Sequence, residues 1–286
     1  MITQIAKALA TGGLPGELHD FGPKARASAA EFVFSAFVQR KPGKTALAVD
    51  TLVNTDGRRQ MRLAVINPDM PFLVDSVAAV IGAHGIVIDR LLHPIITVAR
   101  DGEGAPLEIV KPGGKGAKAE SVIYIETERA DAKTRAEIRN MIVTNLADVR
   151  HSVNDWPKLT QAMKADAAAV PLLRWFADNR FTQLGHAEFI GDGSASAALG
   201  IARTRAQELL SGAARTRAIA WFDAREDGLL IVKSNLLSPV HRRVPLDLMI
   251  VPRRSRGKIQ LFWIGLPSTK PQQNSEKSSP PSRIER

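Results

Sequence analysis

The order of strand and helix patterns predicts an α+β chain whose first folded part has the ferredoxin-like βαββαβ arrangement. Apolar runs rich in Val, Ile and Leu indicate strands at 61–67, 86–100 and 121–128. Apolar residues at helical spacing indicate helices at 71–84 and 132–147. We expect Val149 to Val153 to close the unit as a short fourth strand. The result is a four-stranded antiparallel sheet with two helices on one face.

The first helix follows a turn within Asn67–Val77 that is rich in residues with special backbone preferences. Pro68 and Pro71 restrict this turn, and Asp69 can cap the N–H groups that a new helix leaves free. The apolar stripe of the helix stops at Gly85, a suitable C-terminal breaker. Two interpretations stay open, a core helix with a good start and a strand-to-helix junction that holds a small ligand.

A second, strand-rich α+β part follows two connecting helices. The connecting helices are expected at 155–169 and 171–179, with Pro157 and Pro171 at their starts. Beyond them a helix is expected at 202–210. Strands are expected at 181–190, 218–223, 229–234, 246–251 and 259–264. This order is similar to that of a PAS-like fold.

Composition indicates a cytoplasmic globular protein, with 44% hydrophobic residues, 24% charged residues and no cysteine. Disulfides and cysteine-based metal or redox sites are therefore excluded. The sequence has no apolar run long enough to cross a bilayer, and its first residues lack the layout of a secretion signal. A length of 286 residues suggests two domains.

The net charge of +10 lies mostly in one segment. Residues 1–200 hold 23 basic and 22 acidic side chains, whereas residues 201–260 hold 12 and 5. Ten basic residues there offer a phosphate-binding face: Arg203, Arg205, Arg215, Arg217, Arg242, Arg243, Arg253, Arg254, Arg256 and Lys258. Because aromatic residues for base stacking are sparse, we favour a surface between subunits or domains over nucleic-acid binding.

Several segments resemble the N-terminal region of the large bacterial NAD-specific glutamate dehydrogenases. They are Asn67–Val77, His93-Pro94, Glu120–Glu126, Trp175–Gly185, and Ser238–Arg242 followed by Asp247. The sequence departs from the family pattern at Gln183, where an aromatic residue is usual, and at His186, where tyrosine is usual. These departures bear on local packing.

The resemblance implies an ACT-like domain, a module that binds amino acids or assembles domains beside an enzyme. By position, Asn67, Asp69, Met70 and Asp75 would line its effector site. The carboxylate of Asp69 suits an amino group, and the helix start suits a carboxylate. Pro71-Phe72 stands where the usual ACT turn has a glycine, so an amino-acid effector and a purely structural role both stay open.

The predicted organisation has five parts: a helical lead-in at 1–44, an ACT-like domain at 45–155, connecting helices at 156–180, a basic α+β domain at 181–266 and a tail at 267–286. Phe262–Leu266 resembles the family's last strand of this region, after which the tail holds four prolines, five serines and one aliphatic residue. We expect the tail to be disordered. The abrupt change is typical of a frameshift or a premature stop.

No catalytic, cofactor-binding or metal-binding residues are predicted in this chain. No G-x-G-x-x-G joins a strand to a helix, and the Gly-rich run Lys111–Gly116 lacks P-loop spacing. The six histidines lack metal-ligand spacing. Ser238 and His241 lie near one another without a nucleophile elbow. The chain alone is therefore expected to be inactive, although the full-length family uses NAD.

Three functional hypotheses follow. The first is a regulatory or assembly region of an NAD-dependent glutamate dehydrogenase, with self-association or a missing catalytic region as its partner. The second is a stand-alone amino-acid-sensing module that regulates another enzyme. The third, a basic protein associated with nucleic acid, has the least support from the sequence.

Overall fold

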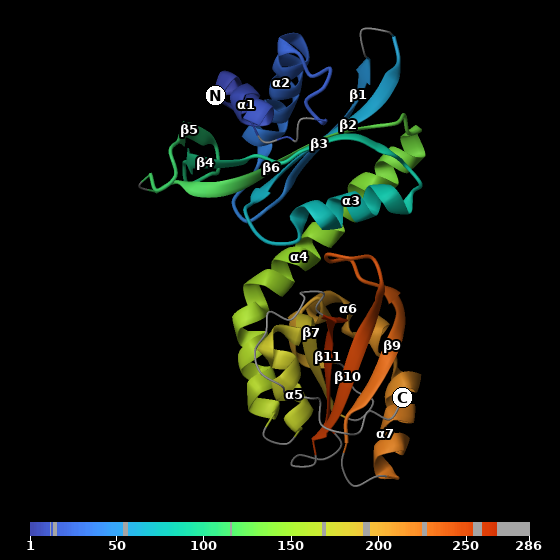
Figure 1. Cartoon of the computed structure of the whole chain (residues 1–286). Coiled ribbons are helices and arrows are strands. Elements are labelled where there is room, and N and C mark those ends of the chain that lie inside the picture. The colour runs from blue at the N-terminus through green and yellow to red at the C-terminus, as the bar shows by residue number, and fades with distance from the viewer. Residues whose placement is uncertain are drawn as a thin grey trace. The chain divides into compact units, whose positions relative to one another are not determined.

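A computed structural model describes residues 1–267 except 12, 14–15, 54–56, 115, 168–169, 191–194, 225–227 and 254–258. The tail from 268 to 286, where we predict disorder, lies outside the described residues. The chain divides into two compact units, Met1–Leu146 and Ala147–Arg286, which are taken in turn (Figure 1). Among the described residues, no helix combines the length and apolarity that a membrane span requires.

The first unit is built on a six-stranded antiparallel sheet. Its strands are β1 (Ala46–Val53), β2 (Arg59–Pro68), β3 (Ile88–Leu92), β4 (Ile95–Arg100), β5 (Pro106–Val110) and β6 (Lys118–Thr127). Their order is β1-β2-β6-β4-β5, and β3 also pairs with β6. The long strand predicted over 86–100 is wrong in one respect, because it is interrupted at His93-Pro94. Proline has no N–H to donate to a ladder, which explains the interruption.

Helices cover both faces of this sheet (Figure 1). On one face lie α1 (Ile2–Thr11) and α2 (Pro23–Gln39), which pack against alternate residues of β2 and β6 such as Ile66 and Tyr124. On the other lie α3 (Leu73–Ala83) and the first turns of α4 (Ala132–Asp166). The two helices predicted for the βαββαβ unit, α3 and the start of α4, therefore share one face as expected, whereas helices on the opposite face were not predicted. The segment 1–44, predicted as a helical lead-in, forms the helical layer on the face opposite α3. The central strands β2 and β6 are therefore buried on both sides.

Charged side chains attach the α1–α2 layer to the sheet. The carboxylate of Glu120, on β6 and 1% exposed, accepts hydrogen bonds from Arg40 and from Arg100. Three sheet arginines also lie over phenylalanine rings of the segment 21–37: Arg62 over Phe32 at 4.3 Å, Arg90 over Phe21 at 4.5 Å and Arg100 over Phe37 at 4.4 Å. Such cation–π contacts strengthen when they are shielded from water.

The helix α4 corrects two predictions, because it continues from Ala132 to Asp166 without a break. Val149 to Val153 is helical and forms no closing strand, and Pro157 lies inside the helix and does not start a new one. Leu146 and Val149 are both fully buried and stand three positions apart, the spacing of one helix face. A five-residue apolar run was too short to distinguish this face from a strand.

The second unit has a five-stranded antiparallel sheet in the order β8-β7-β11-β10-β9. Its strands are β7 (Phe181–Ile190), β8 (Ala195–Gly200), β9 (Leu230–Leu237), β10 (Pro245–Arg253) and β11 (Ile259–Pro267). Its helices are α5 (Pro171–Trp175), the π-helical turn η1 (Phe176–Arg180), α6 (Ala202–Leu209) and α7 (Gly212–Asp223). In chain order, the helices α6 and α7 stand between the second and third strands of this sheet, whereas the predicted order had one strand before a single helix.

The strand predicted at 218–223 is wrong, because these residues form the end of α7. The helix starts at Gly212, after the N-cap Ser211, whose hydroxyl accepts a hydrogen bond from the Ala214 N–H at 3.4 Å. Ala218 and Phe222 are buried four positions apart. Neither this cap nor the strand β8 was predicted.

The two departures from the family pattern both lie inside the second unit. Gln183 and His186, on β7, are each 4% exposed. The ring of His186 lies 4.3 Å from that of Trp263 on the adjacent strand β11. Trp263 belongs to the core cluster formed with α4 and α5. The contact between the rings of His186 and Trp263 therefore fills the core where tyrosine is usual at position 186.

Candidate functional site at the turn between β2 and α3

The four residues predicted to bind an effector lie at one junction of the first unit. Asn67 is near the end of β2, Asp69 and Met70 form the turn, and Asp75 is in the first turn of α3. Asn67 is fully buried, Met70 is half-buried, and Asp69 and Asp75 are exposed. Solvent therefore reaches the two carboxylates, whereas the amide faces the protein.

Asn67 holds the turn in place. The Thr45 hydroxyl donates to Asn67 Oδ1 at 2.7 Å, and Asn67 Nδ2 donates to the carbonyl of Pro68 at 2.8 Å. Both ends of the buried amide are thus bonded within the domain, as buried polar groups require. Asn67 would therefore hold the turn in position and would not contact a ligand itself.

A hydrogen-bonded chain links the turn to two other strands. The Ser121 hydroxyl lies 2.6 Å from Asp69 Oδ1, and His93 Nε2 lies 3.0 Å from the same hydroxyl. The Asp69 N–H donates to the carbonyl of Ala119 at 3.0 Å. Because an ionised carboxylate only accepts, Ser121 donates to Asp69 and His93 donates from Nε2 to Ser121. The order Asp–Ser–His differs from that of a nucleophilic triad, in which histidine lies in the middle.

His93 is held neutral by its surroundings. Burial lowers the pKa of His93, and the Asp69 carboxylate acts in the opposite direction. In the neutral ring, donation to Ser121 requires the tautomer with its proton on Nε2. Ser121, Thr45 and His93 were not predicted as members of this site. Only the β2–β6–β4 pairing brings them together, and a single sequence does not reveal that register.

The start of α3 corrects the predicted role of Asp69. The N-cap is Phe72, which makes no side-chain cap, and the carboxylate of Asp69 is bonded to Ser121 instead. Phe72 has φ 71° and ψ 2°, the left-handed conformation that favours glycine. In the region Pro71-Phe72, where the resemblance leads us to expect a glycine, Phe72 thus has a backbone conformation that glycine adopts freely.

Comparison with known proteins places this junction in a known domain. Residues 6–142 match the family described as "Glutamate dehydrogenase, ACT1 domain". These residues form an ACT1 domain. The match includes α2 and the part of α1 from residue 6 onward, in agreement with their packing on the sheet. It confirms the resemblance found in the motifs of this part of the chain.

Two curated relatives carry the same name. The NAD-specific glutamate dehydrogenase of Pseudomonas aeruginosa is 34% identical over 148 residues, and that of Halomonas elongata is 29% identical over 147 residues. Each alignment covers 44% of this chain but only 9% of the relative. This chain therefore corresponds to a small share of those enzymes.

Among solved structures, the "Structure of an RNA-binding Light-Oxygen-Voltage Receptor" aligns over 90% of this chain and 86% of its own, at 8% identity. Its TM-score of 0.21 is too low to bear on fold or function.

Beyond the ACT1 domain, several residues of the predicted phosphate-binding face are already engaged. Arg203 pairs with Asp155 at 2.6 Å and holds the pKa of that carboxyl below its ordinary value. Arg205 pairs with Asp148 at 2.8 Å, and Arg215 is buried over the ring of Phe189. The side chains at 253, 254, 256 and 258 lie outside the described residues.

No three His, Asp or Glu side chains gather into a metal-binding group in the part of the chain that the structure describes.

Proposed function

We propose that this chain provides the regulatory N-terminal region of an NAD-dependent glutamate dehydrogenase, and that its ACT1 domain binds an amino acid at the turn between β2 and α3. The match of residues 6–142 to the glutamate dehydrogenase ACT1 family carries this proposal. Both relatives are named NAD-specific glutamate dehydrogenase, and the family resemblance implies that the full-length enzyme converts glutamate and NAD to 2-oxoglutarate, ammonium and NADH. A cytoplasmic location and association with a catalytic region are part of the proposal.

The chemistry of the turn supports an amino acid as the effector. Asp69 is exposed, and Ser121 holds one oxygen of its carboxylate, so the carboxylate is oriented and can accept from an ammonium group. The first turn of α3, only a few residues further along, carries the positive end of the helix dipole. An amino acid is a zwitterion, so its ammonium group can pair with Asp69 while its carboxylate lies at the start of α3. Met70, half-buried beside Asp69, supplies apolar surface for a side chain.

In this arrangement the predicted residues have different roles. Asp69 contacts the ammonium group, Met70 contacts the side chain, and Asn67 keeps the turn in position through Thr45. Asp75, in the first turn of α3, lies where a bound carboxylate would approach. Its negative charge therefore favours effectors with few negative charges of their own.

Titration calorimetry of the chain tests the proposal with Asp69→Asn and a matched control. The control is Glu108→Gln on β5, which also removes an exposed carboxylate without changing shape. Millimolar glutamate, aspartate and their amides, followed by the other common amino acids, are titrated in turn. We expect one of them to give heat that Asp69→Asn abolishes and Glu108→Gln retains. A flat isotherm with every amino acid would leave this domain with an assembly role only.

A further inference from the structure

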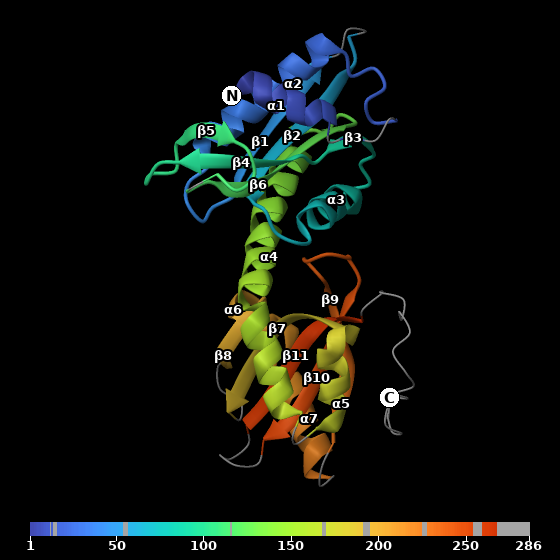
Figure 2. The ribbon, with the colours of Figure 1, turned by 60° about the vertical axis from the view of Figure 1, so that its left-hand side comes forward.

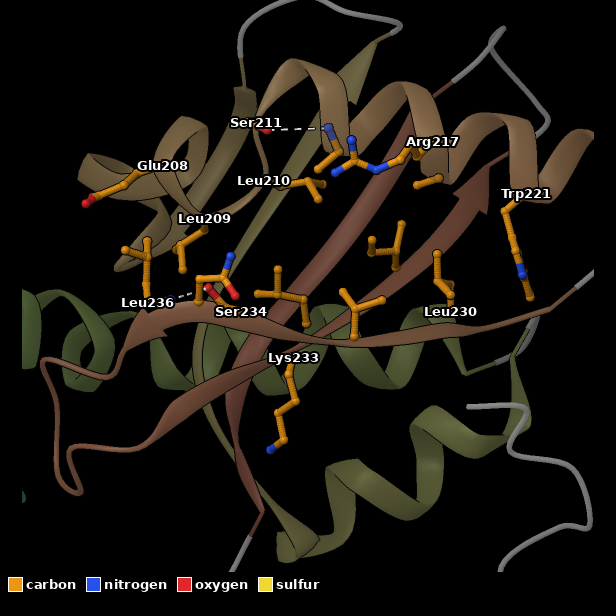
Figure 3. Close-up of a pocket in the computed structure, with 16 residues that line it drawn as sticks. Glu208, Leu209, Leu210, Ser211, Arg217, Trp221, Leu230, Lys233, Ser234 and Leu236 are labelled. Carbon is orange, nitrogen blue, oxygen red and sulfur yellow. Dashed lines mark hydrogen bonds between the residues drawn. The ribbon is translucent and has the colours of Figure 1, made fainter.

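The second unit contains a groove between α7 and the strands β9 and β10 (Figure 3). Its volume is about 500 Å³, within the range of about 300–1,000 Å³ that small-molecule sites occupy. Ala214 and Ala218 face it from the helix, and Val232, Leu248 and Ile250 face it from the strands. Because alanine is small, α7 leaves space over the sheet.

The two ends of the groove differ in polarity. Figure 3 shows Trp221 and Leu230 at one end, and Ser211 and Ser234 toward the other. Each serine oxygen already accepts a backbone hydrogen bond, from Ala214 N at 3.4 Å and Leu236 N at 3.0 Å. Their O–H groups can therefore still donate. The distance along α7 from residue 211 to residue 221 is about 15 Å at the rise of an α-helix.

The charges around the groove favour an anion. Glu208 pairs with Arg205 at 3.5 Å, and Lys233 pairs with Asp247 at 2.6 Å. Figure 3 shows the Lys233 side chain pointing away from α7. Arg217 makes no hydrogen bond or ion pair within the described part of the chain, and its side chain extends toward Ser211 and Leu210. Among the described residues, no carboxylate pairs with this exposed cation at the edge of the groove.

We propose that this groove binds an amphipathic monocarboxylate. The carboxylate pairs with Arg217 and accepts from the hydroxyls of Ser211 and Ser234, while the apolar body lies over Val232 and Leu248 toward Trp221. A guanidinium recognises a carboxylate through two parallel hydrogen bonds, and the apolar lining excludes water from the body of the ligand. The site lies outside the ACT1 domain and does not depend on its proposed effector.

The test uses the full chain and three probes of equal chain length: octanoate, 1-octanol and octylammonium. Calorimetry is carried out on wild type, on Arg217→Gln and on Arg243→Gln, which removes an exposed arginine between β9 and β10. We expect octanoate to bind more tightly than the other two probes. Loss of one charged hydrogen-bonding partner should weaken octanoate binding about tenfold in Arg217→Gln and leave it unchanged in Arg243→Gln.

A second variant tests the position of the ligand independently of charge. Ala214→Phe fills the groove from a half-exposed position of α7 and should abolish octanoate binding while circular dichroism stays native. The proposal is overturned if octanoate gives no heat. It is also overturned if octanoate and octanol bind equally without any effect of Arg217→Gln, which would mean apolar adsorption only. Unchanged octanoate binding by folded Ala214→Phe overturns it as well.

Discussion

At the scale of single residues, Phe72 is the position where backbone and side chain conflict. Its φ of 71° costs an L-residue about 1–2 kcal/mol, a cost that glycine does not have. We therefore expect Phe72→Gly to be more stable than Phe72→Ala by about 1 kcal/mol, although both lose the ring. Urea unfolding measures the difference. At Phe34, inside α2, the order should reverse, because glycine weakens a helix relative to alanine. The same order at both positions would contradict the left-handed turn.

His93 should make the stability of the chain depend on pH. Burial lowers its pKa in the folded state below the ordinary value of 6.5, so protonation favours the unfolded state. This contribution is fully present above pH 6.5 and is lost as the pH falls from 6.5 toward the lower, folded pKa. Between pH 7.5 and 5.5, wild type should lose more unfolding free energy than His93→Gln. The exposed His19 gives the control His19→Gln, which should follow wild type. Parallel curves for His93→Gln and wild type would exclude this role.

At the same scale, the sequence was sufficient to place Asn67, Asp69, Met70 and Asp75 at one junction. Their individual roles could be assigned only from the register in which β2, β6 and β4 pair, which the sequence does not reveal. Asp69 could not be recognised as a partner of Ser121, because 52 positions separate them in the chain. The predicted cap failed for the same reason, since the carboxylate had a better donor on a neighbouring strand.

At the scale of elements, the attachment of α2 to the sheet depends on the buried carboxylate of Glu120. Its two partners, Arg40 and Arg100, are 7% and 8% exposed at their side chains. Glu120→Gln removes the charge that compensates both guanidinium groups, and breaking a buried pair in this way costs about 3–5 kcal/mol. We expect that loss in urea unfolding, whereas Glu108→Gln on β5 should change the unfolding free energy by less than about 0.5 kcal/mol. A loss for Glu120→Gln as small as that of the control would contradict a structural ion-pair cluster.

Most elements of both units could be predicted because their apolar periodicity extends over many residues, as in α3, β6 and β7. The errors fall on short apolar runs. Residues 149–153 and 218–223 have strand-like composition, yet each belongs to a longer helix whose buried face continues beyond the run. The strands β5 and β8 are short and lie at sheet edges, where little burial is needed and the sequence pattern is weak.

At the scale of the whole molecule, we propose that this chain supplies regulation and no catalysis. We expect the purified chain to show no glutamate-dependent reduction of NAD, because the sequence has no glycine-rich junction suited to a dinucleotide. Absorbance at the wavelength of NADH measures this, with enzyme-free buffer as the control. Turnover that scales with protein and persists after repurification would show that the chain carries a catalytic site of its own.

We propose that the ACT1 domain binds an amino acid at the turn between β2 and α3. Hydrogen–deuterium exchange of the full chain with and without each common amino acid at millimolar concentration tests this binding, because exchange reports where a ligand orders the backbone. We expect one of these amino acids to add protection in peptides that cover residues 67–76 and 118–122, and to add none in β9 or α7. Protection confined to the second unit, or no added protection with any amino acid, would rule out this site.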